Sequence, residues 1–298
     1  GRDRRQRQMC IRDRIKGYAK VSNMYGKLYL VSTPIGNLED LTFRAVKILG
    51  SVDLIIAESV ERTNKLLAHY NIDAKVISFN KDNEKRKIKN VVTFLKDSKN
   101  IALVSDAGTP CVSDPGFYLL SNLDDEVKVI PIPGVSSITC ALSISKIPMN
   151  GFIFLGFLPK KENDRKNKLL QASSTNLPLC LFESKHRLLN LFEDISSIFG
   201  KDTMVGLHRE MTKIYETISH KSVSEHISDL KKNTPKGEFV VIVAPNQQVE
   251  VEKPYISIIK SLVLKNFSNK DIVDLIKPIS TDSKKEIYKI VLSIRQGE

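Results

Sequence analysis

The chain has 298 residues, of which 41% are hydrophobic, and carries a formal net charge of +12 at pH 7. This length exceeds the usual size of a single hydrophobic core, so we expect two domains. No run approaches the roughly 20 apolar residues that cross a bilayer, and no signal-peptide pattern is present. We therefore expect a cytoplasmic protein without a membrane partner.

The amino-terminal segment holds half of the net charge. Residues 1–23 contain eight basic and two acidic side chains and show no apolar periodicity, which predicts a disordered basic arm over residues 1–26. The stretch "QMCIRDR" looks like a translated sequencing adaptor, so we expect Met24 to be the natural start. The remaining charge of +6 is compatible with an RNA partner but does not require one.

Short apolar strands alternate with helical segments in the first half of the chain. The expected strands cover residues 28–33, 52–57, 74–79, 101–106 and 127–132. Between them, residues 41–50 predict a helix that ends at Gly50 and has Phe43, Val46, Ile48 and Leu49 on one apolar stripe. This alternation is typical of an α/β domain with a mainly parallel sheet.

A second strand series follows a Pro and Gly interruption near residues 147–151. Its expected strands cover residues 152–158, 178–184, 203–209 and 238–244. We therefore divide the body into an N-terminal α/β domain, 27–148, and a C-terminal α/β domain, 149–250. The four cysteines, Cys10, Cys111, Cys140 and Cys180, are scattered singly. This spacing predicts reduced thiols and no metal site.

Residues 251–298 lose strand character. Ser268 precedes Asp271 by three residues and Ser283 precedes Glu286 by three, which is the spacing of helix capping boxes. The apolar residues that would share one face of the last helix are Ile287, Ile290, Val291 and Ile294. We expect a small helical appendage, which could bind RNA or a partner subunit, or pack on the second domain.

Three loops follow strands of the first half: residues 33–42, 105–116 and 131–141. Each combines glycine, proline and hydroxyl side chains. Because the carboxyl ends of parallel strands meet at one edge of a sheet, we expect the loops to line one crevice. The glycine spacings of dinucleotide and triphosphate sites are absent. Amides and hydroxyls of this kind suit an uncharged nucleoside and an amino-acid tail.

Several long motifs occur in one order along residues 27–294. They are "LYLVSTPIGNLEDLTFRAVKIL", "IALVSDAGTPCVSDPG", "VIPIPGVSS", "GFLPKK", "HREMTKIYE" and "KGEFVVIVAP". Together they resemble the ribosomal RNA small-subunit methyltransferase I family, the 16S rRNA cytidine 2′-O-methyltransferases of the tetrapyrrole methylase superfamily. The resemblance implies two α/β domains with a small helical C-terminal appendage, S-adenosyl-L-methionine in the cleft between the domains, a homodimer, and methylation of a decoding-centre cytidine ribose.

The resemblance also implies a set of cofactor contacts. The matching positions are Pro34 in the first loop, Ser105, Asp106 and Thr109 in the second, Ser136 and Ser137 in the third, and Phe182 and Glu183 at the end of a second-domain strand. The charge of Asp106 would favour a cationic sulfonium. Alternatives remain, because Asp106 could close an Asx-turn and the two serines could cap a helix.

One motif departs from the family. Where the family has Ala-Glu-Asp-Thr-Arg, this chain reads "AESVERT", so Ala57 and Glu58 match whereas Ser59, Val60 and Glu61 replace Asp, Thr and Arg. A glutamate in place of an arginine reverses a charge that could face RNA or a catalytic carboxylate. The departure therefore bears on activity more than on fold, and it leaves a weakened or retuned enzyme open as an alternative.

A ribose hydroxyl is a poor nucleophile unless its proton is removed during attack. Glu58 is the predicted catalytic residue, with Glu210 of "HRE" as a second candidate base and Arg209 as a candidate phosphate ligand. Glu58 could instead be a helix-start charge, and His208 suits a structural role better than a catalytic one. Two other functions stay open: a methylase of a tetrapyrrole or other small substrate, and a non-catalytic RNA-binding relative.

Overall fold

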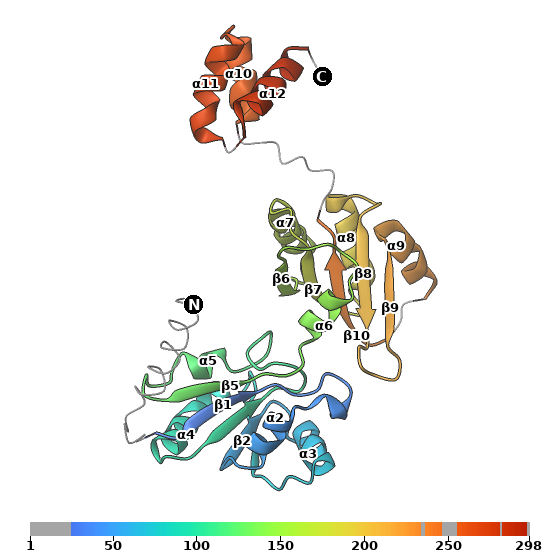
Figure 1. Cartoon of the computed structure of the whole chain (residues 1–298). Coiled ribbons are helices and arrows are strands. Elements are labelled where there is room, and N and C mark those ends of the chain that lie inside the picture. The colour runs from blue at the N-terminus through green and yellow to red at the C-terminus, as the bar shows by residue number, and fades with distance from the viewer. Residues whose placement is uncertain (1–24, 234–235, 246–254, 281, 297–298) are drawn as a thin grey trace, which may run out of the picture.

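The computed structural model describes residues 25–233, 236–245, 255–280 and 282–296. Along the chain, two five-stranded sheets are followed by a group of helices (Figure 1). Most of the predicted basic arm lies outside the described residues. Its last two residues belong to the folded part, since the Gly26 amide donates to the Leu95 carbonyl at 2.6 Å and Tyr25 packs on the first core.

The first sheet is parallel throughout, as predicted, with strand order β3-β2-β4-β1-β5. Its strands are β1 (Lys27–Val31), β2 (Leu54–Ala57), β3 (Val76–Ser78), β4 (Ile101–Val104) and β5 (Lys128–Ile132). All four residues of β2 and of β4 are buried. Continuous apolar runs form these strands because helices and loops cover both faces of the sheet.

Short helices connect these strands. They are η1 (Leu38–Asp40), α2 (Phe43–Leu49), α3 (Val60–His69), α4 (Glu84–Lys96), α5 (Phe117–Leu120) and α6 (Ser137–Ser143). The helix α2 ends before Gly50 as predicted, but the prediction for Phe43 is wrong, because its side chain is 97% exposed. Ala45 and Leu49 face the core. Phe43 precedes Ala45 by two positions and therefore lies on the opposite side of the helix.

The second sheet is mixed, with order β6-β7-β10-β8-β9, a parallel β6-β7 pair and antiparallel pairs elsewhere. Its strands are β6 (Ile153–Phe157), β7 (Leu179–Ser184), β8 (Met204–Arg209), β9 (Thr217–Ser222) and β10 (Glu238–Val243). The strand β9 was not predicted from the sequence. It is an edge strand of sequence TISHKS with no buried residue, so it lacks the apolar run that identifies a central strand.

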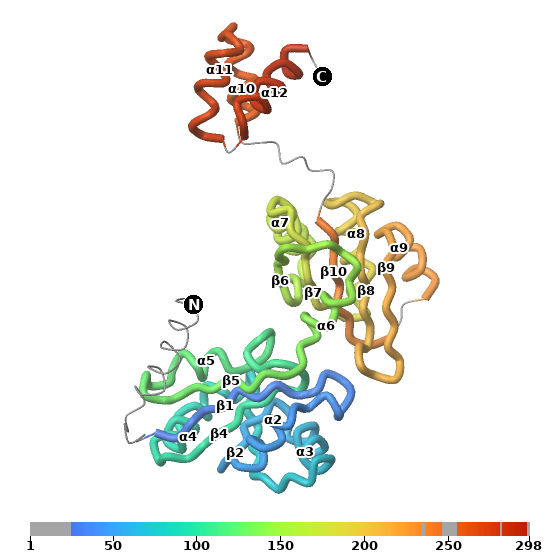
Figure 2. The backbone as a smooth tube through the Cα atoms, in the orientation of Figure 1, coloured from blue at the N-terminus to red at the C-terminus, as the bar shows by residue number. Residues whose placement is uncertain are grey.

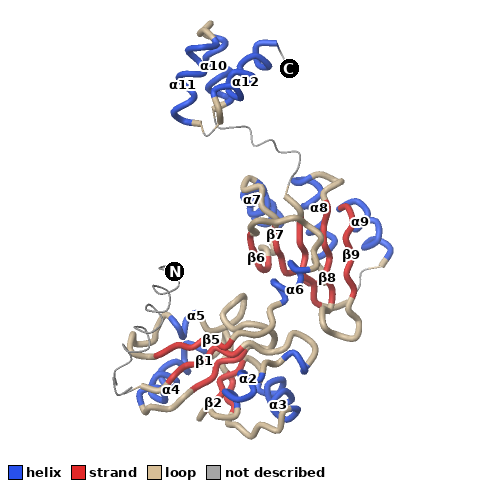
Figure 3. Tube along the Cα trace, viewed as in Figure 1, coloured by secondary structure: helices blue, strands red, loops and turns tan. Residues whose placement is uncertain are grey.

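The two faces of the second sheet have different partners. The helices α7 (Glu162–Ser173), α8 (Leu188–Phe199) and α9 (Val223–Lys232) pack on one face (Figure 3). From the other face, Cys180 and Ile242 join Ile35 and Ala141 of the first domain in one buried apolar cluster. Figure 2 shows α6 between the two sheets, and α6 contacts β10. The interface between the domains is therefore partly a hydrophobic core.

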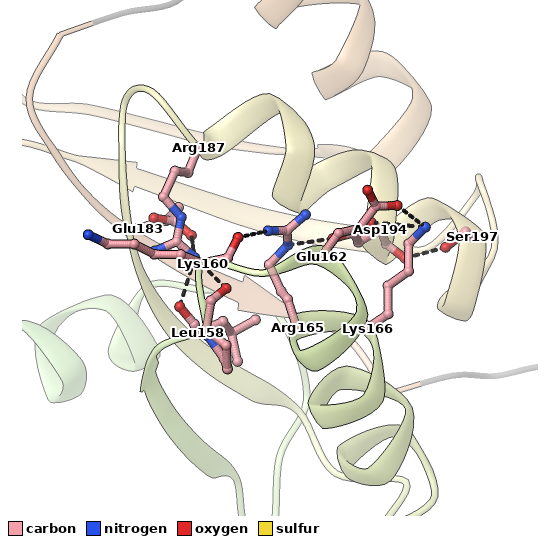
Figure 4. Close-up of polar contacts among 10 residues, drawn as sticks. Leu158, Lys160, Glu162, Arg165, Lys166, Glu183, Arg187, Asp194 and Ser197 are labelled. Atoms are coloured by element: carbon pink, nitrogen blue, oxygen red, sulfur yellow. Dashed lines mark hydrogen bonds and ion pairs between the residues drawn. The ribbon is translucent and has the colours of Figure 1, made fainter.

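A buried ion pair joins α7 to α8 (Figure 4). Arg165 Nε lies 2.5 Å from Asp194 Oδ2, and both side chains are 6% exposed. The Arg165 guanidinium also donates to the Lys160 carbonyl at 3.2 Å. Arg165 comes from the basic run of "LPKKENDRKNK", so one charge of that run has a structural partner and is not a free cation for RNA.

The C-terminal helices form a separate small core. They are α10 (Ile256–Leu264), α11 (Asn269–Ile276), η2 (Lys277–Ile279) and α12 (Lys284–Gln296). The core contains Ile287 and Val291 of α12, which confirms the predicted apolar face, and no residue from either sheet. Ser268 accepts from the Asp271 amide, and Ser283 and Glu286 form reciprocal capping bonds. In the described part of the chain, no helix has the length and apolar content needed to span a membrane.

Candidate functional site

The loops after β1 and β4 are bonded to each other where they leave the first sheet. The Thr33 amide donates to the Gly108 carbonyl and the Gly108 amide donates to the Thr33 carbonyl, both at 2.9 Å. Gly108 has φ +79°, a conformation that glycine adopts without steric cost. The Thr109 hydroxyl lies 3.1 Å from the Ser32 hydroxyl. These bonds fix the loops that the sequence places at the edge of the sheet.

A cavity of about 310 Å³, which we call the interdomain cavity, lies between the two sheets. Loop residues of the first domain form one wall, and β7, β8 and β10 form the other. Of the predicted cofactor contacts, those that line it are Thr109, Ser136, Ser137, Phe182 and Glu183. The structure therefore brings together side chains of the second and third loops with a second-domain strand. Their contact with a cofactor stays a prediction.

The remaining predicted contacts line an adjoining cavity of about 320 Å³, which we call the Arg62 cavity. These residues are Pro34, Ser105 and Asp106. Arg62 and Lys65 of α3 complete a basic side of the same cavity. The two cavities share Ile35, Ala107, Lys213 and Glu238 as wall residues. The predicted set is thus divided between two neighbouring spaces, one mainly apolar and one with a basic edge.

The serines differ in what their hydroxyls do. Ser136 is the N-cap residue of α6, yet its side chain accepts no capping hydrogen bond, so the capping alternative is not realised there. Both Ser136 and Ser137 line the interdomain cavity. Ser105 is buried, and its hydroxyl donates to the Gly108 carbonyl at 3.3 Å. Ser105 therefore stabilises the loop from within, whereas Ser136 has a hydroxyl available to a ligand.

Glu183 is held rigidly in the wall of the interdomain cavity. Its side chain is 1% exposed, and its carboxylate lies 3.2 Å from Arg187 Nη2 (Figure 4). The Ser184 amide donates to the same carboxylate at 2.8 Å. Arg187 also donates to the carbonyl groups of Leu158 and Pro159, at 2.7 and 3.0 Å. This network fixes the position of a buried carboxylate at the cavity wall.

The motif "AESVERT" supplies a positive charge one residue later than expected. Glu61 is exposed and pairs with Lys65 at 2.7 Å, whereas the next residue, Arg62, lies 3.2 Å from Asp106 Oδ2. Ser59 is the N-cap of α3 and accepts from the Arg62 amide, a role that Asp and Ser perform equally well. The charge reversal at Glu61 therefore falls on the outer surface, and Arg62 reaches the carboxylate.

Two carboxylates near the loops have raised pKa values. Burial, together with the charge of Asp106, raises the pKa of Glu58, but Glu58 is not among the residues that line either cavity. Asp114 does line the interdomain cavity, and burial together with the charge of Glu58 raises its pKa to about 6. Asp114 was not among the residues predicted from the sequence to form the site. Its one sequence signal was a second aspartate in the loop 105–116.

The "HRE" motif is divided between the two faces of the second sheet. Glu210 receives hydrogen bonds from Lys213 at 3.0 Å and from the Glu238 amide at 2.8 Å. Burial raises the pKa of Glu210, but these bonds outweigh burial and leave the pKa lowered, so Glu210 is a weak base. Arg209 donates to the Lys236 carbonyl and lines a third cavity, on the other face.

The chemistry of the interdomain cavity fits a sulfonium cofactor. Hydroxyls of the first-domain loops can bind ribose or an amino-acid tail, apolar strand residues can cover a base, and Asp114 places a carboxylate beside a cation. Among the described residues, no group of three or more histidine, cysteine or acidic side chains could hold a metal ion.

Comparison with other proteins gives a consistent assignment. Residues 27–226 match the family described as Tetrapyrrole (Corrin/Porphyrin) Methylases. Proteins named Ribosomal RNA small subunit methyltransferase I are similar over most of the chain. The protein from Escherichia coli O157:H7 is 40% identical, over 80% of this chain and 85% of its own length. That from Thermotoga maritima is 44% identical, over 74% of this chain and 98% of its own.

Solved structures show the same fold at low sequence identity. A uroporphyrin-III-C-methyltransferase from Thermus thermophilus superposes with a TM-score of 0.53 at 19% identity, covering 76% of this chain and 98% of that chain. The methyltransferase CobJ gives a TM-score of 0.58 at 14% identity, covering 74% of this chain and 94% of that chain. The fold and the sequence identities agree, and this chain belongs to the ribosomal RNA small-subunit methyltransferase I family of tetrapyrrole methylases.

Proposed function

We propose that this protein transfers a methyl group from S-adenosylmethionine to the 2′-hydroxyl of a cytidine in the decoding centre of small-subunit ribosomal RNA. The observation that carries the proposal is the pair of adjoining cavities. The interdomain cavity offers hydroxyls and an apolar wall, and the Arg62 cavity offers cations beside it. A nucleoside cofactor suits the first, and a substrate that carries phosphates suits the second.

S-adenosylmethionine supplies an electrophilic methyl group when bound. The protein's part is to align the acceptor hydroxyl and to accept its proton. Glu58 remains our predicted base, and Asp114 is a second candidate because it lines the interdomain cavity. Burial, together with the charge of Glu58, raises the pKa of Asp114 to about 6. Arg62 and Lys65 would hold the RNA backbone through its phosphates.

The test is methyl transfer from labelled cofactor to small ribosomal subunits that lack the modification. The nucleosides are then separated by mass, and 2′-O-methylcytidine is the expected product. Labelled product from a tetrapyrrole or another small acceptor, with none from the subunits, would favour the small-substrate alternative. Cofactor binding without transfer to any of these acceptors would favour the non-catalytic RNA-binding relative.

We further propose that the protein acts in the cytoplasm as a homodimer. Ile214 and Tyr215, in the segment between β8 and β9, are 95% and 71% exposed, and apolar side chains of this size gain from burial in an interface. Light scattering of the purified protein should give twice the mass of the chain. A monomer at micromolar concentration would contradict the dimer without affecting the proposed chemistry.

A further inference from the structure

An exposed aromatic side chain lies beside the interdomain cavity. Phe117 is the first residue of α5, and its side chain is 76% exposed. It follows the loop 105–116, whose residues Val112, Ser113 and Asp114 line the cavity. Phe117 is three residues beyond Asp114, and a chain of that length spans at most about 11 Å. A large molecule that is bound at the cavity can therefore also contact this ring.

The fold keeps the Phe117 ring at the surface. Gly116, directly before it, has φ +124°, and a Cβ there would lie 2.6 Å from Cys111 Sγ, so the chain turns tightly before α5 begins. Leu119 is fully buried in the first core, and Tyr118 packs against the same core. The neighbours of Phe117 in α5 thus occupy the core, and Phe117 itself faces outward.

Two lysines near the start of α4 lie against this region. Lys81 Nζ donates to the Ser113 carbonyl at 3.4 Å, which places one cation on the loop that lines the cavity. Lys85 Nζ lies 5.7 Å from the centroid of the Tyr118 ring, and α4 contacts α5. The exposed Phe117 is therefore flanked by a cation at the loop and by another at the neighbouring helix.

The charge around these lysines favours an anionic partner. Residues 81–89 contain five basic and two acidic side chains. Among the described residues, no carboxylate pairs with three exposed cations of this segment, Lys85, Arg86 and Lys89. Lysine is depleted in the centre of protein–protein interfaces, whereas an aromatic ring flanked by cations is typical of proteins that bind single-stranded nucleic acid.

We propose that an unpaired nucleotide of the ribosomal RNA, close to the methylated ribose, stacks its base on Phe117 while its phosphates contact Lys85 and Arg86. This inference rests on the proposed function. Stacking tolerates any base, because every base has a flat face, so the contact holds the strand without reading its sequence. Arg62 belongs to the helix layer on the opposite face of the first sheet, so the strand is held on both sides of the loops.

The experiment measures the KM of the full-length protein for small ribosomal subunits that lack the modification. Phe117→Ala should raise this KM about tenfold, because a base loses its stacking partner. Phe117→Leu should raise it as well, since leucine has no flat ring, whereas Phe117→Trp should stay within about threefold of the wild type. The kcat and the affinity for S-adenosylhomocysteine should stay within about twofold in all three variants.

Phe152→Ala is the matched control. Phe152 is also an exposed phenylalanine, but it lies just before β6, at the opposite end of that strand from the cavity-lining Phe157. Its variant should keep the KM of the wild type within about twofold. An unchanged KM in Phe117→Ala would overturn the inference. If Phe117→Ala instead halves the mass measured by light scattering, this face is an interface between copies of the chain, which overturns the inference as well.

The phosphate contacts are tested by the double variant Lys85→Gln with Arg86→Gln. The logarithm of its affinity for labelled subunits should depend less steeply on the logarithm of salt concentration, with a slope smaller by about 1.4, since each contact to a single strand contributes about 0.7. An unchanged slope would remove α4 from the RNA surface. The proposed function fails separately, when the wild-type protein transfers no methyl group to the subunits. In that case subunit binding still decides, and equal affinities of the wild type and Phe117→Ala would overturn the inference.

Discussion

Two neighbouring residues of "AESVERT" have different surroundings although both are charged. Arg62 lies 3.2 Å from Asp106 and lines the Arg62 cavity, whereas Glu61 pairs with Lys65 on the surface. The Arg62 side chain is 66% exposed even in this ion pair, so it is accessible to a phosphate. The function of the motif therefore depends on position 62, a distinction that the linear pattern does not make.

Arg62→Gln should lower single-turnover methylation of small subunits about tenfold to a hundredfold, because a charge-assisted contact to RNA is lost. Cofactor affinity should stay within about twofold, since Arg62 does not line the interdomain cavity. Glu61→Gln is the matched control, and its rate should stay within about twofold of the wild type. Equal rates in both variants would remove Arg62 from the substrate site.

Asp114 couples the cavity to pH. Burial, together with the charge of Glu58, raises the pKa of Asp114 in the folded protein from its ordinary value of 3.8 to about 6, so folding disfavours the charged form. Ionisation of Asp114 therefore does not lower the free energy of unfolding below about pH 4, and it lowers it by the full amount above about pH 6. Asp114→Asn should raise the free energy of unfolding at pH 8 by about 1 kcal/mol, a value reduced for partial exposure, and should change it less at pH 4.5.

Urea unfolding at the two pH values measures this difference, and a destabilised Asp114→Asn protein at pH 8 would contradict it. The same variant tests the base. If Asp114 accepts the ribose proton, its methylation rate loses the rise with pH that the wild type shows near pH 6. Glu58→Gln is the comparison, since it should abolish that rise only if Glu58 is the base.

At the scale of elements, α7 and α8 are joined by a buried charge pair that the sequence presents only as part of a basic run. Arg165 and Asp194 are 29 residues apart, and both side chains are 6% exposed. Lys166 Nζ adds a longer contact to Asp194 at 3.6 Å. Removing one member leaves an uncompensated buried charge, which costs more than removing both.

Asp194→Ala should lower the free energy of unfolding by about 3 to 5 kcal/mol. The double variant Arg165→Met with Asp194→Leu should lose much less, because no charge is then left buried. Glu162→Ala, which removes an exposed partner of Lys166, should leave the free energy of unfolding unchanged. Chemical denaturation of the three proteins decides, and a double variant as unstable as Asp194→Ala would contradict the argument.

At the scale of the whole molecule, the C-terminal helices form a unit with its own core. Tyr255, Ile259 and Ile272 are buried against the other helices of this unit, and neither sheet contributes to the cluster (Figure 1). The two α/β domains, in contrast, share a buried cluster beside the interdomain cavity. The interdomain cavity therefore depends on the two α/β domains together and not on the C-terminal helices.

A chain that ends at residue 245 should keep the affinity of the full protein for S-adenosylhomocysteine within about twofold, because it retains every wall of the interdomain cavity. Calorimetry on the two proteins is the measurement. A loss of affinity of more than about tenfold would show that the helices support the cofactor site. The proposed domain boundary between residues 148 and 149 falls in the segment that joins α6 to β6.

Local features were predictable because neighbours in the sequence determine them. The parallel strands of the first sheet, the helix stop at Gly50 and the caps at Ser268 and Ser283 all follow from short patterns. The edge strand β9 was not predicted, and the prediction that Phe43 lies on an apolar stripe was wrong. Both features depend on which face of an element meets the core. Propensity and periodicity do not contain that information.

The sequence by itself determined the α/β class, the loops at the carboxyl ends of three strands and the family, because these depend on runs of adjacent residues. Only the tertiary structure decided which side chains share a cavity. It placed Asp114 and His208 in the wall of the interdomain cavity and gave Arg62, not Glu61, the contact with Asp106. Burial and hydrogen bonding between distant residues set these roles, so no local pattern could reveal them.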